Sequence, residues 1–342
     1  MLLALFRTAV LGGLVACCSS HSFARELTPE RRAVVDAHAL AAPAHVEKSS
    51  QTLAQYLTKP FSTEREKLRA IYRWIADRVT YDVESYLSGR EVKVSADEVL
   101  AKRISVCEGY ASLFSDLAGH AGLKVQNIPG HAKGFGAARA FASDAKPNHM
   151  WTAVHIDGEW RMIDTTWGAG YVDGGTFKKV LSEAFFLVPP EQLAFTHYPV
   201  DHRWQLQKTP KISLQEFNAL PHLPNTHFNQ HLSPFETWDT IKAADFEGTL
   251  VHTFDLPVGL AKVSKAPLHH FLKTQRTYAF VIDSQHFTDM AFVQGDKWIH
   301  FDKSGNTFSS QLKTEIAGDL MVLGKPPNAD NYVAILRYTV QR

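Results

Sequence analysis

The stretch ISVCEGY at residues 104–110 contains Cys107, the one cysteine after residue 18. Ser105, followed three residues later by Glu108, is a capping-box pattern that predicts the start of a helix. The residues that follow have the apolar spacing of a helix, and a glycine supplies its stop (Tyr110, Leu113, Phe114, Leu117, Ala121, Gly122). We therefore expect Cys107 in the first turn of a buried helix, where the helix dipole favours a thiolate. A structural cysteine, acting as a small hydrophobic residue, would fit the same position.

A second segment predicts a β-hairpin. Residues 148–156, NHMWTAVHI, have the composition of a strand, and the dipeptide Asp157-Gly158 is a strong signal for a two-residue turn. Residues 159–167 form the predicted return strand. In that register Ile156 faces Glu159, Trp151 faces Asp164 and His149 faces Thr166.

The predicted register brings His149 close to Asp164. Side chains alternate along a strand, so these two residues share one face as diagonal neighbours. A carboxylate there would orient the imidazole while the other ring nitrogen meets Cys107, which is the logic of a nucleophile, a base and an orienting group. A register slip of one residue would place His149 and Asp164 on opposite faces.

In these residues the chain resembles the transglutaminase-like superfamily, and more closely its kyphoscoliosis-peptidase branch. Cys107 at a helix start, His149 in NHMW and Asp164 in IDTTWG carry the resemblance, which covers about residues 60–207. Further supporting segments are residues 130–134, 164–170, 186–191, 197–199 and 204–206. The resemblance implies a papain-like core with a Cys–His–Asp triad in this chain order. One departure is Met150, where the family usually has a small residue.

The expected fold is α+β: a papain-like transglutaminase core, with the cysteine helix on an antiparallel sheet, followed by a small all-β sandwich. The expected domains are a signal peptide at 1–24, a helical extension at 25–58, a catalytic domain at 59–208 and a β-sandwich at 209–342. Short β-like runs separated by turn residues favour the sandwich. Immunoglobulin-like modules often follow the core in the kyphoscoliosis-type relatives, so the resemblance extends weakly here.

The composition describes an ordinary globular protein with almost no net charge. There are 36 basic and 35 acidic residues, and no basic stripe or motif that predicts nucleic-acid binding. The 17 histidines lack the spacing of metal ligands, and the pair His269-His270 is a weak candidate. We expect neither a metal nor a cofactor.

The first two dozen residues have the pattern of a targeting segment. Arg7 precedes an apolar stretch at residues 8–16, which is too short to span a bilayer as a mature helix. Residues 22–24, SFA, fit ordinary signal cleavage, whereas residues 14–17, LVAC, resemble a bacterial lipobox that would attach a lipid anchor through Cys17. Either route predicts export to the periplasm or beyond. Cys17 also fits as a plain apolar signal residue.

These features predict an exported thiol enzyme that acts on peptide or amide bonds of a protein or peptide substrate through a thioester. Hydrolysis is favoured over crosslinking, and a non-catalytic binding scaffold is the alternative from another class. Trp151 and Trp167 are expected to pack in the core. The loop at 131–148 precedes His149, so it either borders the cleft or is a solvated connector. The substrate identity and the oligomeric state stay open.

Overall fold

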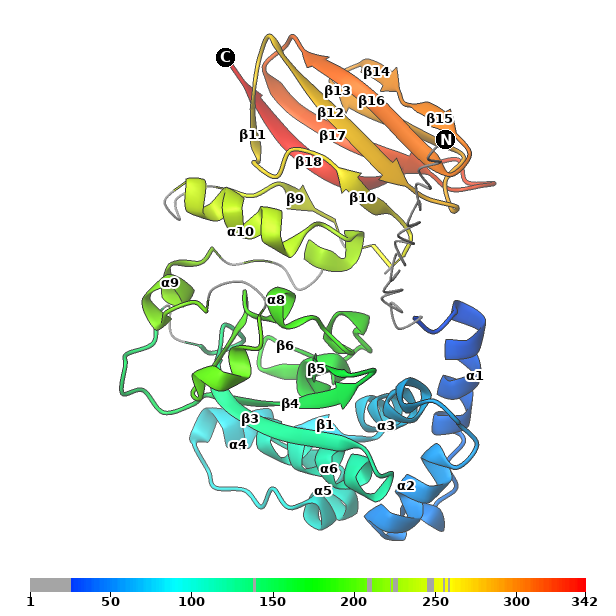
Figure 1. The fold of residues 1–342 in the computed structure, drawn as a ribbon, viewed down its shortest axis with the longest axis vertical. Helices are drawn as coiled ribbons and strands as arrows, with labels where there is room; N and C mark the ends of the chain where they lie inside the picture. Colours follow the sequence, from blue (N-terminus) through cyan, green and yellow to red (C-terminus); the bar gives the residue numbers. More distant parts are fainter. Residues whose placement is uncertain are drawn as a thin grey trace, which may run out of the picture.

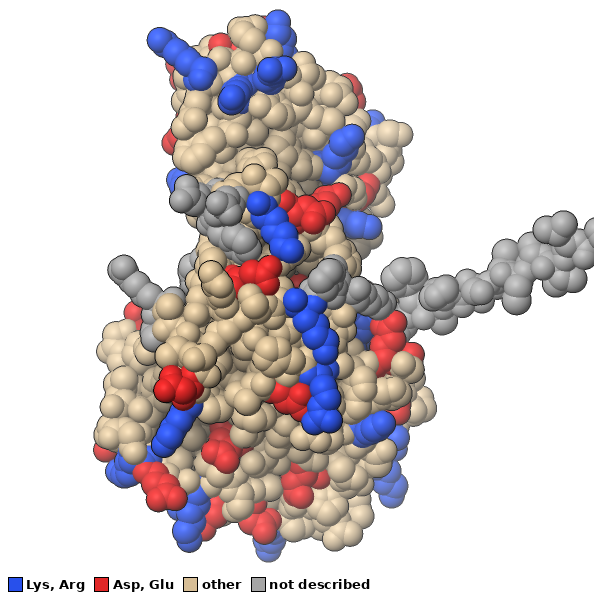
Figure 2. All heavy atoms as spheres, turned by 60° about the vertical axis from the view of Figure 1, so that its left-hand side comes forward, with Lys and Arg blue, Asp and Glu red and all other residues tan. Residues whose placement is uncertain are grey.

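The computed structural model describes residues 26–137, 140–207, 211–221, 223, 227–244, 249–254, 256–257 and 259–342. The predicted signal segment and Cys17 lie outside these residues. The chain forms a larger lobe of helices and a sheet, and a smaller lobe made of β-strands (Figure 1). A narrower waist joins the two lobes, and basic and acidic side chains are interspersed on the face of the larger lobe that Figure 2 shows. No helix in the described part of the chain is long and apolar enough to cross a membrane.

The N-terminal extension contains two helices, as predicted. These are α1 (Pro29–Leu40) and α2 (Ser50–Thr58), with the 3₁₀ turn η1 (Val46–Lys48) between them. The next helix, α3 (Glu64–Arg78), begins with the capping box that the sequence predicts at Thr63 and Glu66. Buried Arg69 of α3 binds Asp36 of α1 and Glu183, so this arginine ties the extension to the core.

The cysteine helix α6 (Cys107–His120) follows α4 (Val83–Ser88) and α5 (Ala96–Lys102). The predicted capping box at Ser105 is wrong: the N-cap residue is Val106, and no side chain caps the helix. Ser105 instead belongs to the short strand β2 (Ile104–Ser105), which pairs in parallel with β1 (Thr80–Tyr81). This pairing between distant segments fixes Ser105 in a strand and leaves Cys107 as the first helical residue.

The sheet of the larger lobe has four strands in the order β5-β4-β3-β8. Its strands are β3 (Lys124–Ala132), β4 (His149–Ile156), β5 (Glu159–Ile163) and β8 (His197–Pro199), and α6 lies against β3 and β4 (Figure 1). The predicted register is confirmed, because Ile156 pairs with Glu159 and Thr152 with Ile163. Both turn residues have positive φ, 54° at Asp157 and 79° at Gly158, as a two-residue hairpin of this type requires.

The predicted return strand is wrong after Ile163. Asp164 caps the short helix α7 (Thr165–Ala169), and its carboxylate accepts hydrogen bonds from the backbone N–H groups of Thr166 and Trp167. His149 therefore pairs with Gly130 of β3 and not with Thr166. The segment after α7 contains the remaining elements of this lobe, β6 (Gly170–Asp173), β7 (Thr176–Lys179), η2 (Glu183–Phe185), α8 (Pro190–Leu193) and η3 (His202–Gln205).

The C-terminal region begins with helices and ends in two sheets. The helical elements are α9 (Leu214–Ala219), η4 (His227–Gln230) and α10 (Pro234–Ala243), so the strands begin later than residue 209. One sheet has the order β10-β12-β16-β15, and the other has the order β11-β18-β17-β13-β14 with β9 on β18. Side chains from both sheets share one apolar core, for example Phe280 and Phe308 from the first and Phe292 and Tyr338 from the second.

The β-like runs that the sequence predicts at 249–254, 277–283, 290–294, 298–301, 319–323 and 332–340 match β9, β12, β13, β14, β17 and β18. The strands of the smaller lobe are β9 (His252–Thr253), β10 (Lys262–Lys265), β11 (Phe271–Lys273), β12 (Arg276–Asp283), β13 (Asp289–Gln294), β14 (Lys297–His300), β15 (Asp302–Ser304), β16 (Thr307–Thr314), β17 (Gly318–Lys325) and β18 (Val333–Gln341). Strands β10, β11, β15 and β16 were not expected from the sequence. In β16, the longest of these four, polar residues fill most of the strand and only Phe308, Leu312 and Thr314 are buried.

Candidate active site

Cys107 occupies the first position of α6 and is half-buried. In the first turn, the N–H groups of Gly109 and Tyr110 bond to the carbonyl of Val106. The first N–H groups of a helix have no acceptor within the helix. The N–H of Cys107 therefore points out of the helix end and can donate to a group that lies there. The sulfur is therefore placed beside the positive end of the helix dipole.

His149, the first residue of β4, is bonded to Asp164 as the hairpin register predicts. The distance from His149 Nε2 to Asp164 Oδ2 is 2.7 Å, and both side chains are buried. The same carboxylate caps α7 with Oδ1, at 2.9 Å from the N–H of Thr166 and 3.0 Å from that of Trp167. Each oxygen of Asp164 thus has its own partners, and the carboxylate is held in one orientation.

The electrostatics favour an ion pair between these two side chains. Burial on its own would lower the pKa of His149, but the Asp164 carboxylate and Cys107 outweigh it and raise the pKa to about 10. Burial likewise opposes the charge of Asp164, yet His149 and His197 hold the pKa of this carboxyl well below its usual range. A positive imidazolium and a negative carboxylate are therefore buried together.

Cys107 is within interaction range of the same imidazole. A hydrogen bond and the charge of Cys107 are among the causes that raise the pKa of His149. Because Nε2 is bonded to Asp164, Nδ1 is the ring nitrogen left for the sulfur. After burial, the charge of Cys107 is the next cause that raises the pKa of Tyr81 and of Tyr86, so both phenols also lie near the sulfur. The structure brings Cys107, His149 and Asp164 together.

A second histidine, His197 of β8, also contacts Asp164. Its Nε2 lies 3.1 Å from Asp164 Oδ2, and its Nδ1 lies 2.8 Å from the hydroxyl of Thr196. Burial is the main cause that lowers the pKa of His197 to about 4, so the ring is neutral at pH 7. A neutral ring with a carboxylate at Nε2 donates from Nε2 and accepts the Thr196 proton at Nδ1.

His197 was not among the site residues that the sequence predicts, although residues 197–199 support the family resemblance. Its place comes from the pairing of β8 with β3, in which His197 faces Ala132. This pairing spans three residues and joins segments about 65 positions apart, so local spacing gives no signal for it.

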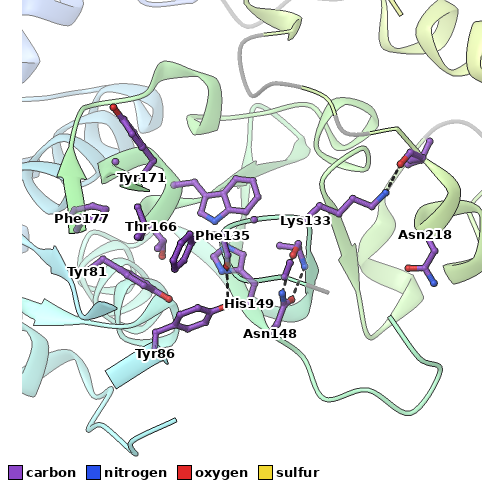
Figure 3. Close-up of a pocket in the computed structure, with 17 residues that line it drawn as sticks. Tyr81, Tyr86, Lys133, Phe135, Asn148, His149, Thr166, Tyr171, Phe177 and Asn218 are labelled. Carbon is purple, nitrogen blue, oxygen red and sulfur yellow. Dashed lines mark hydrogen bonds between the residues drawn. The ribbon is translucent and has the colours of Figure 1, made fainter. Parts of the chain in front are cut away.

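A cavity of about 870 Å³ opens beside His149. Its wall is rich in aromatic residues, and Figure 3 shows Tyr81, Tyr86 and Phe135 on one side of His149, with Phe177 farther out on the same side. Residues 132–135, 137 and 148 supply another part of the wall, so the loop before His149 borders the cleft. At Gly134 the backbone approaches the indole of Trp167 so closely that a Cβ would lie 2.6 Å from it.

Comparison with known proteins agrees with this geometry. Residues 51–165 match the family described as the transglutaminase-like superfamily. This part of the chain is therefore similar to transglutaminase-like domains. Over 207 residues the chain is 30% identical to kyphoscoliosis peptidase of Mus musculus, with 60% of the chain and 31% of that protein covered. Over 212 residues it is 26% identical to Hillarin of Drosophila melanogaster, covering 58% of the chain and 25% of that protein.

The chain thus spans about a third or less of the curated relatives it matches. Among solved structures, one described as a TGase is 20% identical, covers 47% of the chain and 38% of its own, and has a TM-score of 0.26.

Trp151 and Trp167, which closely follow His149 and Asp164 in the sequence, differ in exposure. Trp151 is 2% exposed and packs in the core, as predicted. Trp167 is half-buried, lines the cavity and lies 5.5 Å from His149 and 4.5 Å from His197, centroid to centroid. The Trp167 ring therefore packs against both histidines and also forms part of the cavity wall.

From the sequence, His120, His131 and His155 are expected to be core histidines without a catalytic role. His131 is buried and stacks on Phe141, and half-buried His155 packs edge-on against Trp160. The expectation of a core position for His120 is wrong: it is exposed at the end of α6, 3.7 Å from Asp116, because α6 turns that face to solvent.

The site also contains a set of atoms that could hold a metal ion. One ligand atom from each of His149, Asp164 and His197 lies within 4.8 Å of the others. Both imidazole Nε2 atoms, however, are at hydrogen-bond distance from one carboxylate oxygen, where each is satisfied by donating a proton. The arrangement fits a hydrogen-bonded His–Asp–His cluster without a metal.

Proposed function

We propose that this protein is a thiol enzyme that cleaves or transfers acyl groups at peptide or amide bonds, with Cys107, His149 and Asp164 as its catalytic residues. The observation that carries the proposal is the buried His149–Asp164 pair, 2.7 Å apart, beside a cysteine at a helix N-terminus and an aromatic cavity. The match to the transglutaminase-like superfamily over residues 51–165 supports the same reaction class.

The chemistry follows from these positions. The Cys107 sulfur attacks the carbonyl carbon, and the backbone N–H of Cys107 is placed to donate to the developing oxyanion. His149 gives its Nδ1 proton to the leaving amine as the C–N bond breaks, which leaves a thioester on Cys107. Water then attacks the thioester and His149 takes a proton from that water. The C–S bond breaks, the acid leaves, and the Cys107 thiolate and protonated His149 are restored. Asp164 keeps its bond to Nε2 throughout and holds the ring.

His197 serves as a positioning residue in this scheme. It donates to the same carboxylate oxygen that accepts from His149, at 3.1 Å. Its own ring is fixed by Thr196 on its other side. A neutral N–H donor at this place stabilises the charged form of Asp164. Because His197 stays neutral, the positive charge next to Asp164 is that of His149.

We favour hydrolysis over crosslinking, because water is abundant outside the cytoplasm and no feature of the sequence marks an amine-acceptor site. Export itself is also proposed, from the targeting pattern of residues 1–24, with Cys17 as a lipid anchor if the LVAC segment is processed as a lipobox. Mass spectrometry of the protein from its native cell would distinguish a lipidated N-terminus at Cys17 from cleavage after Ala24.

The first experiment measures alkylation of Cys107 by iodoacetamide near neutral pH. We expect Cys107 to react faster than a free thiol, and we expect His149→Ala to remove the difference. His155→Ala is a matched control, because His155 lies on the same strand but points to Trp160. Equal rates in the unmodified protein, in His149→Ala and in a free thiol would overturn the enzyme proposal.

The second experiment separates the reaction types and the scaffold alternative. Incubation with a peptide substrate and a fluorescent primary amine gives acid product from hydrolysis and labelled peptide from crosslinking. If Cys107→Ala leaves the biological function intact, the protein acts as a scaffold that uses the same fold.

A further inference from the structure

The cavity beside His149 has two chemically different ends. One end is walled by aromatic rings, and two of them, those of Tyr81 and Tyr86, lie near the Cys107 sulfur. The other rings at this end are those of Phe135, Trp167, Tyr171 and Phe177. At the other end lies Lys133, whose side chain Figure 3 shows extending away from Tyr81 and Tyr86, toward the part of the wall that holds Asn218. Among the described residues that line the cavity none is Asp or Glu.

Lys133 is held in place, and it has no negative partner among the residues that the structure describes. Its backbone N–H bonds to the carbonyl of Thr196 at 3.0 Å, which fixes the residue just beyond β3. Its Nζ donates to the carbonyl of Leu220 at 2.8 Å and lies 4.7 Å from the ring centroid of Phe217. No carboxylate in the described part of the chain lies within ion-pair distance of it, and burial lowers the pKa of Lys133 to about 8.

An ammonium group in this situation favours an anionic ligand. It has three N–H donors, and the Leu220 carbonyl takes one of them. Half-buried charges that lack a counter-ion gain more from an incoming carboxylate than exposed charges do, because less water screens the pair. The aromatic end, in contrast, favours apolar or aromatic groups, which remove its rings from water.

We propose that this cavity selects peptide acyl donors that carry a large apolar or aromatic side chain near the reacting amide and a carboxylate that reaches Lys133. This inference rests on the proposed function for the chemistry at Cys107, but it concerns only which peptides bind. The carboxylate belongs either to an acidic side chain or to a free C-terminus. In both cases its two oxygens accept hydrogen bonds from the Lys133 ammonium group.

The test measures peptide binding to the full-length Cys107→Ala protein by fluorescence anisotropy, so that no reaction is needed. Three N-acetylated peptides with one phenylalanine are compared: one with glutamate and an amidated C-terminus, one with glutamine in its place and an amidated C-terminus, and the glutamine peptide with a free C-terminal carboxylate. We expect one of the two acidic peptides to bind about tenfold more tightly than the neutral one, with the difference shrinking in high salt. Replacing phenylalanine by alanine is expected to weaken all three.

Two variants assign the effect to Lys133. Lys133→Met is expected to abolish the preference for the acidic peptide, whereas Lys133→Arg retains most of it. Lys124→Met is the matched control, because Lys124 lies at the other end of β3, over Trp160 and away from the cavity lining. If Lys133 acts only as a tether to Leu220, Lys133→Met weakens every peptide equally, and the proposal is overturned.

Equal binding of acidic and neutral peptides to the Cys107→Ala protein would also overturn it. Neither outcome bears on the alkylation of Cys107 by iodoacetamide, which tests the thiol chemistry alone. Failure of the cavity proposal and failure of the proposed enzyme are therefore distinguishable.

Discussion

The pair His149–Asp164 and the pair His300–Asp289 have nearly the same length but lie in very different surroundings. His149 lies 2.7 Å from Asp164 in the larger lobe, where their side chains are 6% and 0% exposed. His300 lies 2.8 Å from Asp289 on the smaller lobe, where the side chains are 56% and 32% exposed. Water screens the exposed pair, whereas the buried pair interacts in a low dielectric and fixes the charge of both partners. Distance alone therefore does not distinguish a chemically poised pair from a surface contact.

The contrast extends to the two cores. The larger lobe buries Arg69, Glu66, His149, Asp164 and His197. Among the described residues from 249 onward, the buried polar side chains are the neutral Thr253, Ser284 and Thr314. Burying a charge costs free energy unless it is paired and hydrogen-bonded. The larger lobe bears that cost in two places, at Glu66 and Arg69, which join α3 to α1, and at the cluster of His149, Asp164 and His197. The described part of the sandwich core buries no charged side chain.

The sharpest way to break this comparison is to remove one charge from each pair. In Asp164→Asn the amide oxygen can still cap α7, and the NH₂ group then faces His149 Nε2. Because NH₂ donates a hydrogen bond, Nε2 must accept, and the neutral imidazole is held with its proton on Nδ1, so Nδ1 cannot accept a proton. We expect the rate of peptide hydrolysis to fall about 10⁴-fold, by analogy with triads whose aspartate is replaced by asparagine. Steady-state kinetics with the best peptide substrate measures this change.

Asp289→Asn is the matched control, since it removes the same charge from a pair of the same length. We expect its hydrolysis rate to stay within about twofold of the unmodified protein, because an exposed pair has little energy to lose. A large loss of activity in Asp289→Asn, or a small one in Asp164→Asn, would contradict the distinction between the pairs.

The buried pair also predicts a pH dependence of stability. The pKa of His149 is raised to about 10 in the folded chain, after burial is outweighed by Asp164 and Cys107. In the unfolded chain it is about 6.5, so the stabilisation is complete below about pH 6.5 and is lost as the pH rises through 10. At about 1.4 kcal/mol per pKa unit, the free energy of unfolding should fall by about 3 kcal/mol between pH 7 and 10 from this group.

Urea denaturation at both pH values, compared between the unmodified protein and His149→Gln, isolates this contribution. The variant is expected to show the smaller decline, and His155→Gln on the same strand is expected to behave like the unmodified protein. Parallel declines in all three proteins would show that the His149–Asp164 pair contributes nothing to the pH dependence.

His197 supplies a finer test, because it touches Asp164 without touching the sulfur in the proposed scheme. Its hydrogen bond is one of the causes that lower the pKa of Asp164. His197→Phe removes that donor, so the pKa of Asp164 should rise and the acid limb of the rate profile should move to higher pH. We expect kcat to fall about tenfold with little change in KM, as for other groups that orient a reacting residue.

The conservative variant His197→Gln keeps an N–H donor and should restore most of kcat and the original acid limb. A merely structural role for His197 would lower stability in both variants and leave the acid limb unmoved. The pH profile therefore separates positioning from packing.

The positions of residues that local spacing determines could be predicted from the sequence. The positions of residues that depend on pairing between distant segments could not. The Asp157-Gly158 turn fixes the hairpin register, and that register brings His149 to Asp164. The same logic failed at Ser105, because its partner Tyr81 in β1 is 24 positions earlier and draws it into a strand. Local spacing also gave no signal for His197, because a three-residue pairing of β8 with β3 brings this residue to the site.

Asp164 shows how two local signals compete. Continuing the alternation of the hairpin predicts a strand to Trp167, while aspartate before Thr165 and Thr166 is also a favourable helix N-cap. The cap prevails, because Asp164 Oδ1 accepts from two backbone N–H groups and a strand would offer it none of these. The side chain still reaches His149, since the backbone of Asp164 itself remains extended at φ −116° and ψ 100°.

The smallest expected effect concerns the exposed pair itself. His300→Gln removes one partner of Asp289, which still accepts a hydrogen bond from Tyr332. An exposed ion pair contributes about 0–1 kcal/mol, and salt reduces even that. We therefore expect a change of less than about 1 kcal/mol in the free energy of unfolding, and none once the salt concentration reaches about 1 M. Denaturation in low and high salt measures both quantities. If His300→Gln destabilised the protein as much as His149→Gln does at pH 7, burial would not be what separates the two pairs, and the charge of His149 would need another cause.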